Sequence, residues 1–208
     1  MIKLYSWTTP NGRKVSIALE EMGLEYECIA VDIGKDEQFA PEFLKISPNN
    51  KIPAITDGDI ALFESGAILS YLAHKTGQFA PAEGTSEFWQ MTQWLHWQMG
   101  GFGPILGQAH HFLKYNPGKS AYSEERYHNE AKRLYGVLDA QLGKKAYLVE
   151  SLSIADFAIW PWVSRFDYHQ MDLHEFPNVK RWYLELASRP GFQRGYAQPN
   201  DVGAIPMP

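Results

Sequence analysis

The sequence has a single cysteine, Cys28, among its 208 residues. One cysteine excludes an intramolecular disulfide, a Cys-x-x-Cys redox pair and a zinc site built from cysteines. Cys28 lies between Glu27 and Ile29 in the middle of an expected strand, so we expect an inert thiol. Any thiol chemistry of this protein must therefore use a thiol from another molecule.

Long apolar runs and an excess of one charge are also missing. No apolar stretch approaches the roughly 20 residues that span a bilayer, and residues 1–5 read as a strand rather than as the core of a signal peptide. The formal net charge is -5, from 19 basic and 24 acidic residues, and no block of Lys or Arg occurs. We therefore expect a cytoplasmic protein that binds neither nucleic acid nor membranes.

The first third of the chain alternates between strand and helix patterns. Turn residues and hydrophobic spacing predict a strand near residues 2–5, a helix over Gly12–Met22, a strand over Tyr26–Ile33, a short helix near Pro41–Ile46, strands over Ala54–Thr56 and Ile60–Phe63, and a helix from Glu64 that ends before Gly77. The order is βαβ followed by ββα. This order predicts a domain over residues 1–78, with a linker over 79–86.

Residues 87–208 carry helical patterns only. A long amphipathic stretch runs from Glu124 to Leu142, and a last helix is predicted over Pro177–Ser188, stopped by Arg189-Pro190. Ser153 and Asp156 have the spacing of a capping box, which predicts the start of a buried helix. The fold class is therefore α+β, with an all-helical second domain.

This arrangement resembles the glutathione S-transferase superfamily over nearly the whole chain. The resemblance rests on the domain order, the capping box and the segments 9–12, 47–55, 62–68, 97–101 and 107–112, and the last two make the chain similar to the bacterial nu-class branch. It implies a thioredoxin-like domain that binds glutathione, a homodimer, and glutathione-dependent disulfide reduction with weaker conjugating or peroxidase activity.

A glutathione enzyme must stabilise the glutathione thiolate, because a free thiol is mostly protonated at neutral pH. Thr9 and Asn11 lie where a loop turns into a helix, so their side chains and the helix dipole can face an anion. The pattern alone favours an ordinary turn and helix cap for these residues, whereas the resemblance favours the catalytic role. Tyr5 and Ser6 are competing hydroxyls, because other classes of the superfamily use Tyr or Ser near the end of the first strand.

The resemblance also assigns the residues that bind glutathione. It implies a cis bond before Pro53, with Ile52 pairing with the glutathione backbone. Lys51 can meet the glycyl carboxylate, and Gln38 and Asn50 are further polar candidates, each of which is otherwise a solvated loop residue.

The γ-glutamyl end of glutathione carries both charges. Glu64 can pair with its ammonium, and Ser65 at a helix start can bind its carboxylate, the alternative for Ser65 being an ordinary N-cap. Arg133 can reach a glutathione carboxylate in a dimer, or can lie on a solvated helix face. His110 and His111 point in different directions on a helix and have no third ligand, so we expect no metal.

Three functions remain open from the sequence. The first is disulfide reduction by glutathione acting on a small disulfide. The second is conjugation of glutathione to an electrophile, which needs the same thiolate. The third is a non-catalytic binding or regulatory protein with the same fold, because fold alone does not fix function.

Overall fold

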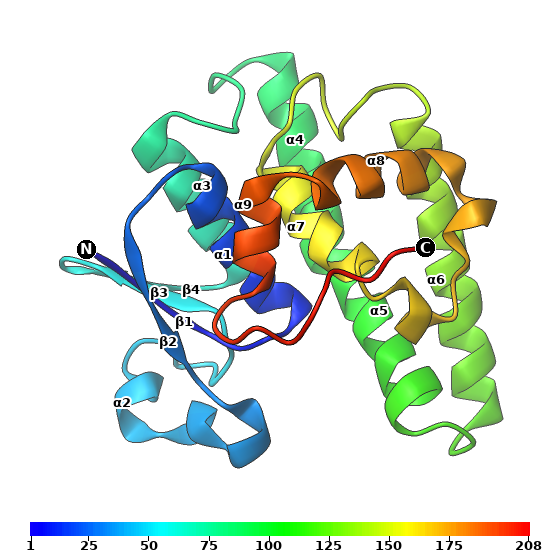
Figure 1. Cartoon of the computed structure of the whole chain (residues 1–208), viewed down its shortest axis with the longest axis horizontal. Coiled ribbons are helices and arrows are strands. Elements are labelled where there is room, and N and C mark those ends of the chain that lie inside the picture. The colour runs from blue at the N-terminus through cyan, green and yellow to red at the C-terminus, as the bar shows by residue number, and fades with distance from the viewer. The chain divides into compact units, whose positions relative to one another are not determined.

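A four-stranded sheet lies at the centre of the first part of the chain in the computed structural model, which describes residues 1–208 (Figure 1). Its strands are β1 (Ile2–Ser6), β2 (Tyr26–Ala30), β3 (Ala54–Asp57) and β4 (Ile60–Phe63). The strand order is β2-β1-β3-β4, with β1 parallel to β2 and the other two pairs antiparallel. The predicted βαβ-ββα order is thereby confirmed.

Helix α1 (Pro10–Glu21) connects β1 to β2 and is the most deeply buried element of this sheet unit. Nine of its twelve residues are buried, because it packs against β1, α3 (Ser65–Thr76) and α9 (Pro190–Tyr196). At the entry to α1, a Cβ on Gly12 would overlap Ser6 Oγ and the carbonyl oxygen of Trp7. Only glycine therefore lets the strand turn so closely into the helix.

The strand predicted over Tyr26–Ile33 ends earlier, at Ala30. Asp32 caps a 3-10 turn, Ile33–Lys35, and its carboxylate accepts a hydrogen bond from the N–H of Gly34 at 2.9 Å. An aspartate with a backbone donor two residues on favours a turn over an extended strand. A second 3-10 turn, Glu37–Phe39, and the short helix α2, Pro41–Leu44, follow.

The prediction that Pro177–Ser188 is the last helix is wrong. Helix α8 (Pro177–Ala187) is followed by α9, which begins at Pro190. Proline has no N–H to donate, and the first turn of a helix needs none, so Pro190 starts a helix instead of ending one. In Figure 1 this helix lies beside α1, and a Cβ on Gly195 would come within 2.6 Å of the backbone of Ile17.

The chain divides into two compact units, one of residues 1–78 with 187–205 and the other of residues 79–186 with 206–208. The expected division assigned all of 87–208 to the helical domain. Helix α9 instead belongs to the sheet unit, because Arg13 of α1 lies over the ring of Tyr196, 3.5 Å from its centroid, and donates to its carbonyl oxygen at 3.1 Å.

The second unit is helical throughout. Its helices are α4 (Ser86–Trp97), α5 (Gly103–Ala109), α6 (Ala121–Leu142), α7 (Ile154–Val163) and α8. Two π-helical segments, Gln98–Phe102 and His110–Tyr115, flank α5, so the glycine-rich stretch at 100–103 continues the helical path. Helix α6 begins three residues before the predicted Glu124 and ends at the predicted Leu142.

The capping box at the start of α7 is confirmed. All ten residues of α7 are buried, and Asp156 receives hydrogen bonds from the N–H of Leu148, the N–H and hydroxyl of Ser153, and Nε1 of Trp182. Burial raises the pKa of Asp156 to about 6, while these donors favour its ionised form. The carboxylate thus ties α8 and the preceding loop to the start of α7.

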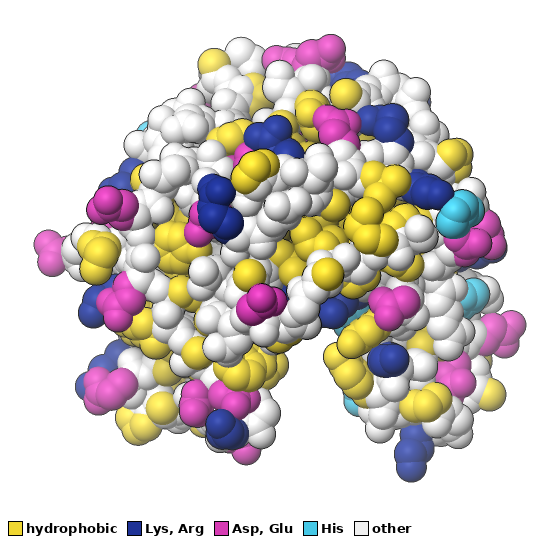
Figure 2. Space-filling view, in the orientation of Figure 1, with side chains coloured by type: hydrophobic (Ala, Val, Ile, Leu, Met, Phe, Trp, Pro, Cys, Tyr) yellow, Lys and Arg dark blue, Asp and Glu magenta, His cyan; other side chains and the backbone are white.

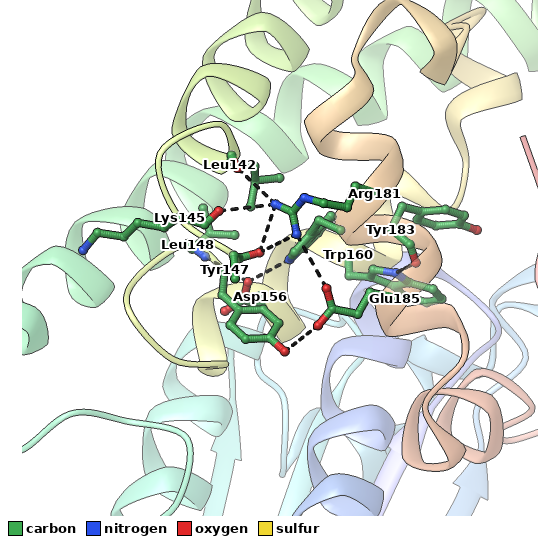
Figure 3. A network of polar contacts seen from close by, with 11 residues as sticks. Leu142, Lys145, Tyr147, Leu148, Asp156, Trp160, Arg181, Tyr183 and Glu185 are labelled. Carbon is green, nitrogen blue, oxygen red and sulfur yellow. Dashed lines mark hydrogen bonds and ion pairs between the residues drawn. The ribbon is translucent and has the colours of Figure 1, made fainter.

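Arg181 on α8 also binds the loop between α6 and α7 (Figure 3). Its guanidinium donates to the carbonyl oxygens of Leu142, Lys145 and Ala146 at 3.0–3.3 Å. The carbonyl of Leu142 belongs to the last turn of α6, where a helix leaves acceptors without partners, and the other two carbonyls lie in the loop that follows. The segment between α6 and α7 is therefore held by side chains and not by regular structure.

Basic and acidic side chains are interspersed over the face of the molecule drawn in Figure 2. No helix has the length and apolar character needed to cross a membrane.

Replacing Asp156 by alanine should strongly destabilise the helical unit. The change leaves buried N–H donors without an acceptor, and we expect the free energy of unfolding to fall by roughly 3–5 kcal/mol. Denaturant titration followed by tryptophan fluorescence measures the loss. Asp172→Ala, the same change at an exposed carboxylate, is the control and should cost far less stability. Equal effects of the two changes would contradict the role of Asp156.

Candidate glutathione site

The ends of the strands bring separate parts of the sequence to one edge of the sheet. In the antiparallel pairs, Ala54 lies opposite both Tyr5 and Phe63. The segment after β1, the residues before β3 and the residues after β4 therefore meet at the same edge. Because β2 runs parallel to β1, the segment that follows Ala30 leaves from this edge as well.

Thr9 and Asn11 lie at this edge, at the first turn of α1. Thr9 is the N-cap, and its hydroxyl oxygen accepts from the N–H of Gly12 at 3.3 Å, while Asn11 is the second residue of the helix. Both residues are half-buried. A hydroxyl that accepts one bond can donate its own hydrogen to another group, so the capping role and an anion-binding role are compatible at Thr9.

The competing hydroxyls are placed less favourably. Ser6 is buried within β1, and its hydroxyl donates to the carbonyl oxygen of Trp7 at 3.4 Å. The Tyr5 ring packs against Phe43, with the ring centroids 6.2 Å apart. Neither side chain lies at the first turn of a helix.

The loop before β3 carries the next group of predicted residues. The Ile52–Pro53 peptide bond is cis, as expected, and Pro53 is buried. Ser47 fixes the loop, because its hydroxyl donates to the carbonyl oxygen of Lys51 at 2.8 Å. The side chain of Lys51 is exposed, and Asn50 has a left-handed backbone with φ of 46°.

Gln38 lies in the 3-10 turn that follows β2. Its Nε2 is 3.5 Å from Asp36 Oδ1, and its Oε1 is buried without a hydrogen-bond partner. A buried amide oxygen without a donor carries a desolvation cost, which a ligand N–H can relieve. The Oε1 atom of Gln38 is therefore available as a hydrogen-bond acceptor.

Glu64 and Ser65 start α3 at the same edge, but not as an ordinary cap. Glu64 is the N-cap, with a φ of 69°, an exposed side chain and no capping hydrogen bond. Ser65 is the first helical residue, and its buried hydroxyl accepts from Lys14 Nζ at 3.2 Å. The alternative interpretation of Ser65 as an N-cap is therefore wrong.

The cysteine is unsuited to act as a nucleophile. Cys28 lies in the middle of β2, opposite Leu4 of β1, and is half-buried. Burial raises the pKa of its thiol to about 11, so at neutral pH it is protonated.

Arg133 lies on α6, in the helical unit. It makes a two-pronged ion pair with Glu130, at 2.8 and 2.7 Å, and is exposed. Both residues line an open cavity of about 670 Å³ on α6, together with Ile105, Tyr122, Glu125, Arg126, Tyr127 and Asn129.

The two histidines differ in their surroundings. His110 is buried and stacks on His169 with ring centroids 4.5 Å apart, whereas His111 is exposed. No group of three His, Cys, Asp or Glu side chains is arranged to hold a metal ion.

The sequence analysis did not identify one buried residue of this region. Lys14 is buried beside Ser65, and burial lowers the pKa of its amine to about 7. The position of this lysine among the apolar residues Val15, Ala18 and Leu19 could have indicated its burial. A lysine at such a position, however, usually extends to solvent along the helix surface.

Comparison with known proteins shows the family of this chain. Residues 1–74 match the glutathione S-transferase N-terminal domain, and residues 121–185 match the glutathione S-transferase C-terminal domain. The chain is 51% identical over 198 residues to the disulfide-bond oxidoreductase YfcG of Escherichia coli (strain K12), across 91% of this chain and 92% of that protein.

Solved structures of glutathione transferases are also similar to this chain. A glutathione transferase from Pseudomonas putida, with one glutathione disulfide bound per subunit, superimposes with a TM-score of 0.90 at 44% identity, over 96% of this chain and 92% of that one. A family member from Pseudomonas fluorescens Pf-5, with two glutathione molecules bound, gives 0.89 at 45% identity, over 94% and 92%. The chain belongs to the glutathione S-transferase family.

Proposed function

We propose that this protein is a glutathione-dependent disulfide reductase whose reacting sulfur belongs to bound glutathione. The observation that carries the proposal is the first turn of α1, where the Thr9 hydroxyl and the Asn11 amide lie at the positive end of a buried helix. The only thiol of the chain, that of Cys28, is protonated and lies within a strand. The site is thus arranged to activate a thiolate that the protein itself does not supply.

Hydrogen bonding can account for this activation. Lowering the pKa of a thiol by about two units corresponds to about 2.7 kcal/mol. Two charge-assisted hydrogen bonds, from Thr9 and Asn11, supply an amount of this size. The helix dipole adds to it, because the first turn of α1 has N–H groups outside the helical ladder.

The rest of the sheet edge would bind the tripeptide. Ser65 and Glu64 would hold the γ-glutamyl carboxylate and ammonium, and the backbone at Ile52, before Pro53, would pair with the peptide. Lys51 would meet the glycyl carboxylate, with Gln38 and Asn50 as further polar contacts. Arg133 would contact a glutathione carboxylate only after its ion pair with Glu130 breaks. It is therefore the weakest of these candidate binding residues.

The proposed reaction consists of two thiol–disulfide exchanges. The bound glutathione thiolate attacks one sulfur of a disulfide, its S–S bond breaks, and the first thiol leaves as a thiolate that takes up a proton. A second glutathione thiolate then attacks the mixed disulfide and releases the second thiol and oxidised glutathione. In sum, one disulfide and two glutathione molecules give two thiols and one glutathione disulfide.

The relatives support this reaction over conjugation. YfcG is named a disulfide-bond oxidoreductase, and the Pseudomonas putida structure holds the oxidised product of the reaction, glutathione disulfide. The segments 97–101 and 107–112, which resemble the nu-class branch, support membership of that branch. Family membership likewise supports a homodimer in the cytoplasm, and sedimentation analysis tests the dimer.

A parallel assay separates the candidate functions. Purified protein is given glutathione with a small mixed disulfide, or with a chlorinated aromatic electrophile. Glutathione reductase and NADPH report the oxidised glutathione. We expect fast disulfide turnover and weak conjugation. The reverse ranking would make this a conjugating transferase, and glutathione binding without turnover would favour the non-catalytic function.

The Thr9 hydroxyl should act on the rate and not only on stability. Thr9→Ala removes a donor aimed at the thiolate, so we expect kcat for disulfide reduction to fall about 10- to 100-fold with a small change in glutathione affinity. Thr9→Ser keeps the hydroxyl and should retain most of the activity. Asn11→Ala should lower kcat in the same direction.

A matched control is available in the helical unit. Thr85 caps α4 in the same way, accepting from the N–H of Phe88 at 3.2 Å. Thr85→Ala should cost about 1 kcal/mol of stability, as expected for a lost cap, and should leave kcat unchanged. If Thr9→Ala behaves like Thr85→Ala, Thr9 is only a helix cap.

Cys28→Ser tests the source of the sulfur. Disulfide reduction should persist at nearly the original rate, because the reacting sulfur comes from glutathione. The rate is measured beside circular dichroism and a melting curve. An inactive but folded variant would show that the protein cysteine takes part.

A further inference from the structure

Lys14 is the one strongly buried lysine of the sheet unit, and the proposed chemistry has so far assigned it no role. It lies on α1 with 1% of its surface exposed, and its Nζ donates to Ser65 Oγ at 3.2 Å. Burying an ammonium group away from water is unfavourable unless a nearby anion or acceptor compensates. Because the Lys14 ammonium donates to Ser65, an anion that binds at Ser65 would further compensate the burial of this charge.

Two positive features meet at Ser65. One is the amino-terminal end of α3, whose first N–H groups lie outside the helical ladder. The other is the Lys14 ammonium, directed at the same hydroxyl. The carboxylate of Glu64 raises the pKa of Lys14, and because the Glu64 side chain is exposed, solvent weakens this attraction.

We propose that Lys14 is the positioning residue for the γ-glutamyl carboxylate of glutathione, acting through Ser65, and that binding of this carboxylate draws a proton onto Lys14. The inference rests on the proposed function, because it assumes that glutathione binds at this edge. The Ser65 hydroxyl accepts from Lys14 and can donate its own hydrogen to the carboxylate, so the three groups form one polarised chain.

Proton uptake follows from the low pKa of Lys14. Desolvation lowers the pKa of Lys14 to about 7, so about half of the molecules carry a neutral amine at that pH. A carboxylate arriving at Ser65 stabilises the ammonium and raises this pKa. Glutathione binding near neutral pH therefore protonates Lys14, and affinity should fall as the pH rises above 7.

Other charged groups near α1 are paired elsewhere. On β1, Lys3 pairs with Glu27. Arg189, which precedes α9, pairs with Glu21, and Arg194 on α9 pairs with Glu20. On α3, Lys75 pairs with Asp57, and His74 lies in the last turn, at the opposite end from Ser65. Glu64 remains the charged group that acts on Lys14.

The low pKa of Lys14 also determines how the stability of the folded protein changes with pH. The unfolded chain holds the Lys14 proton more tightly than the folded protein does, so the contribution of Lys14 to stability rises as the pH goes from about 7 toward the unfolded value near 10.4. A charged Lys14 thus destabilises the folded protein at neutral pH. A Lys14→Met variant should therefore fold, with a melting temperature at pH 7 no lower than that of the original protein.

The test uses S-methylglutathione, which has both carboxylates and the ammonium but no thiol to ionise. Calorimetric titration in buffers of different ionisation enthalpy measures the protons exchanged on binding. We expect uptake of roughly half a proton at pH 7 and more at pH 8, with affinity falling about fivefold between these pH values. Binding without proton uptake by the unaltered protein would overturn the role of Lys14 and leave the glutathione site standing.

Lys14→Met should weaken binding about tenfold or more at pH 7, abolish the uptake and flatten the pH profile. In the disulfide assay it should raise the KM for glutathione with kcat nearly unchanged, opposite to the effect expected for Thr9→Ala. Unchanged affinity in Lys14→Met would contradict the inference. In a double-mutant cycle with Ser65→Ala, the two losses should not add, because one acts through the other.

Arg13→Met is the matched control. Arg13 is the neighbouring buried cation of α1, but it faces Tyr196 of α9 instead of Ser65. Its removal should leave both affinity and proton uptake unchanged. Failure of the unaltered protein to bind S-methylglutathione at all would overturn the proposed function itself, and so is distinguishable from a failure of the Lys14 proposal.

Discussion

The burial of helix α1 is the constraint on which the rest of the sheet unit depends. Gly12 lets the strand turn closely into the helix, and α1 is then enclosed by β1, α3 and α9. Its buried side chains fix both neighbouring helices, because Arg13 lies on Tyr196 of α9 and Lys14 contacts Ser65 of α3. A helix held in this way presents its first turn, with Thr9, in one fixed orientation at the sheet edge.

That orientation is what links the fold to the chemistry. An enzyme without a usable cysteine must lower the pKa of a thiol it binds, and donors placed beforehand at the positive end of a helix do so without reorganisation. Thr9 and Asn11 lie at the start of α1, and Ser65 lies at the start of α3. In the proposed complex, one helix end stabilises the sulfur and the other binds the γ-glutamyl end, so the two helices together set where the thiolate lies.

Features governed by local sequence were predictable, and features governed by tertiary packing were not. The βαβ-ββα order and the capping box of Ser153 and Asp156 follow from turn residues and periodicity, and both are confirmed. Helix α9 was missed because Pro190 is read as a stop, while its seven residues become stable only against α1. The burial of Lys14 was missed for a related reason, since its amine contacts Ser65 of α3, which is far from it in the sequence.

In the proposed mechanism, hydrogen-bond donors at the start of α1 ionise the thiol of bound glutathione. The most direct measurement is a pH titration of protein-bound glutathione, followed by the ultraviolet absorbance of its thiolate and compared with free glutathione. We expect a pKa for the bound thiol about one to two units below that of the free thiol. A bound thiol that titrates at the same pH as free glutathione would contradict it.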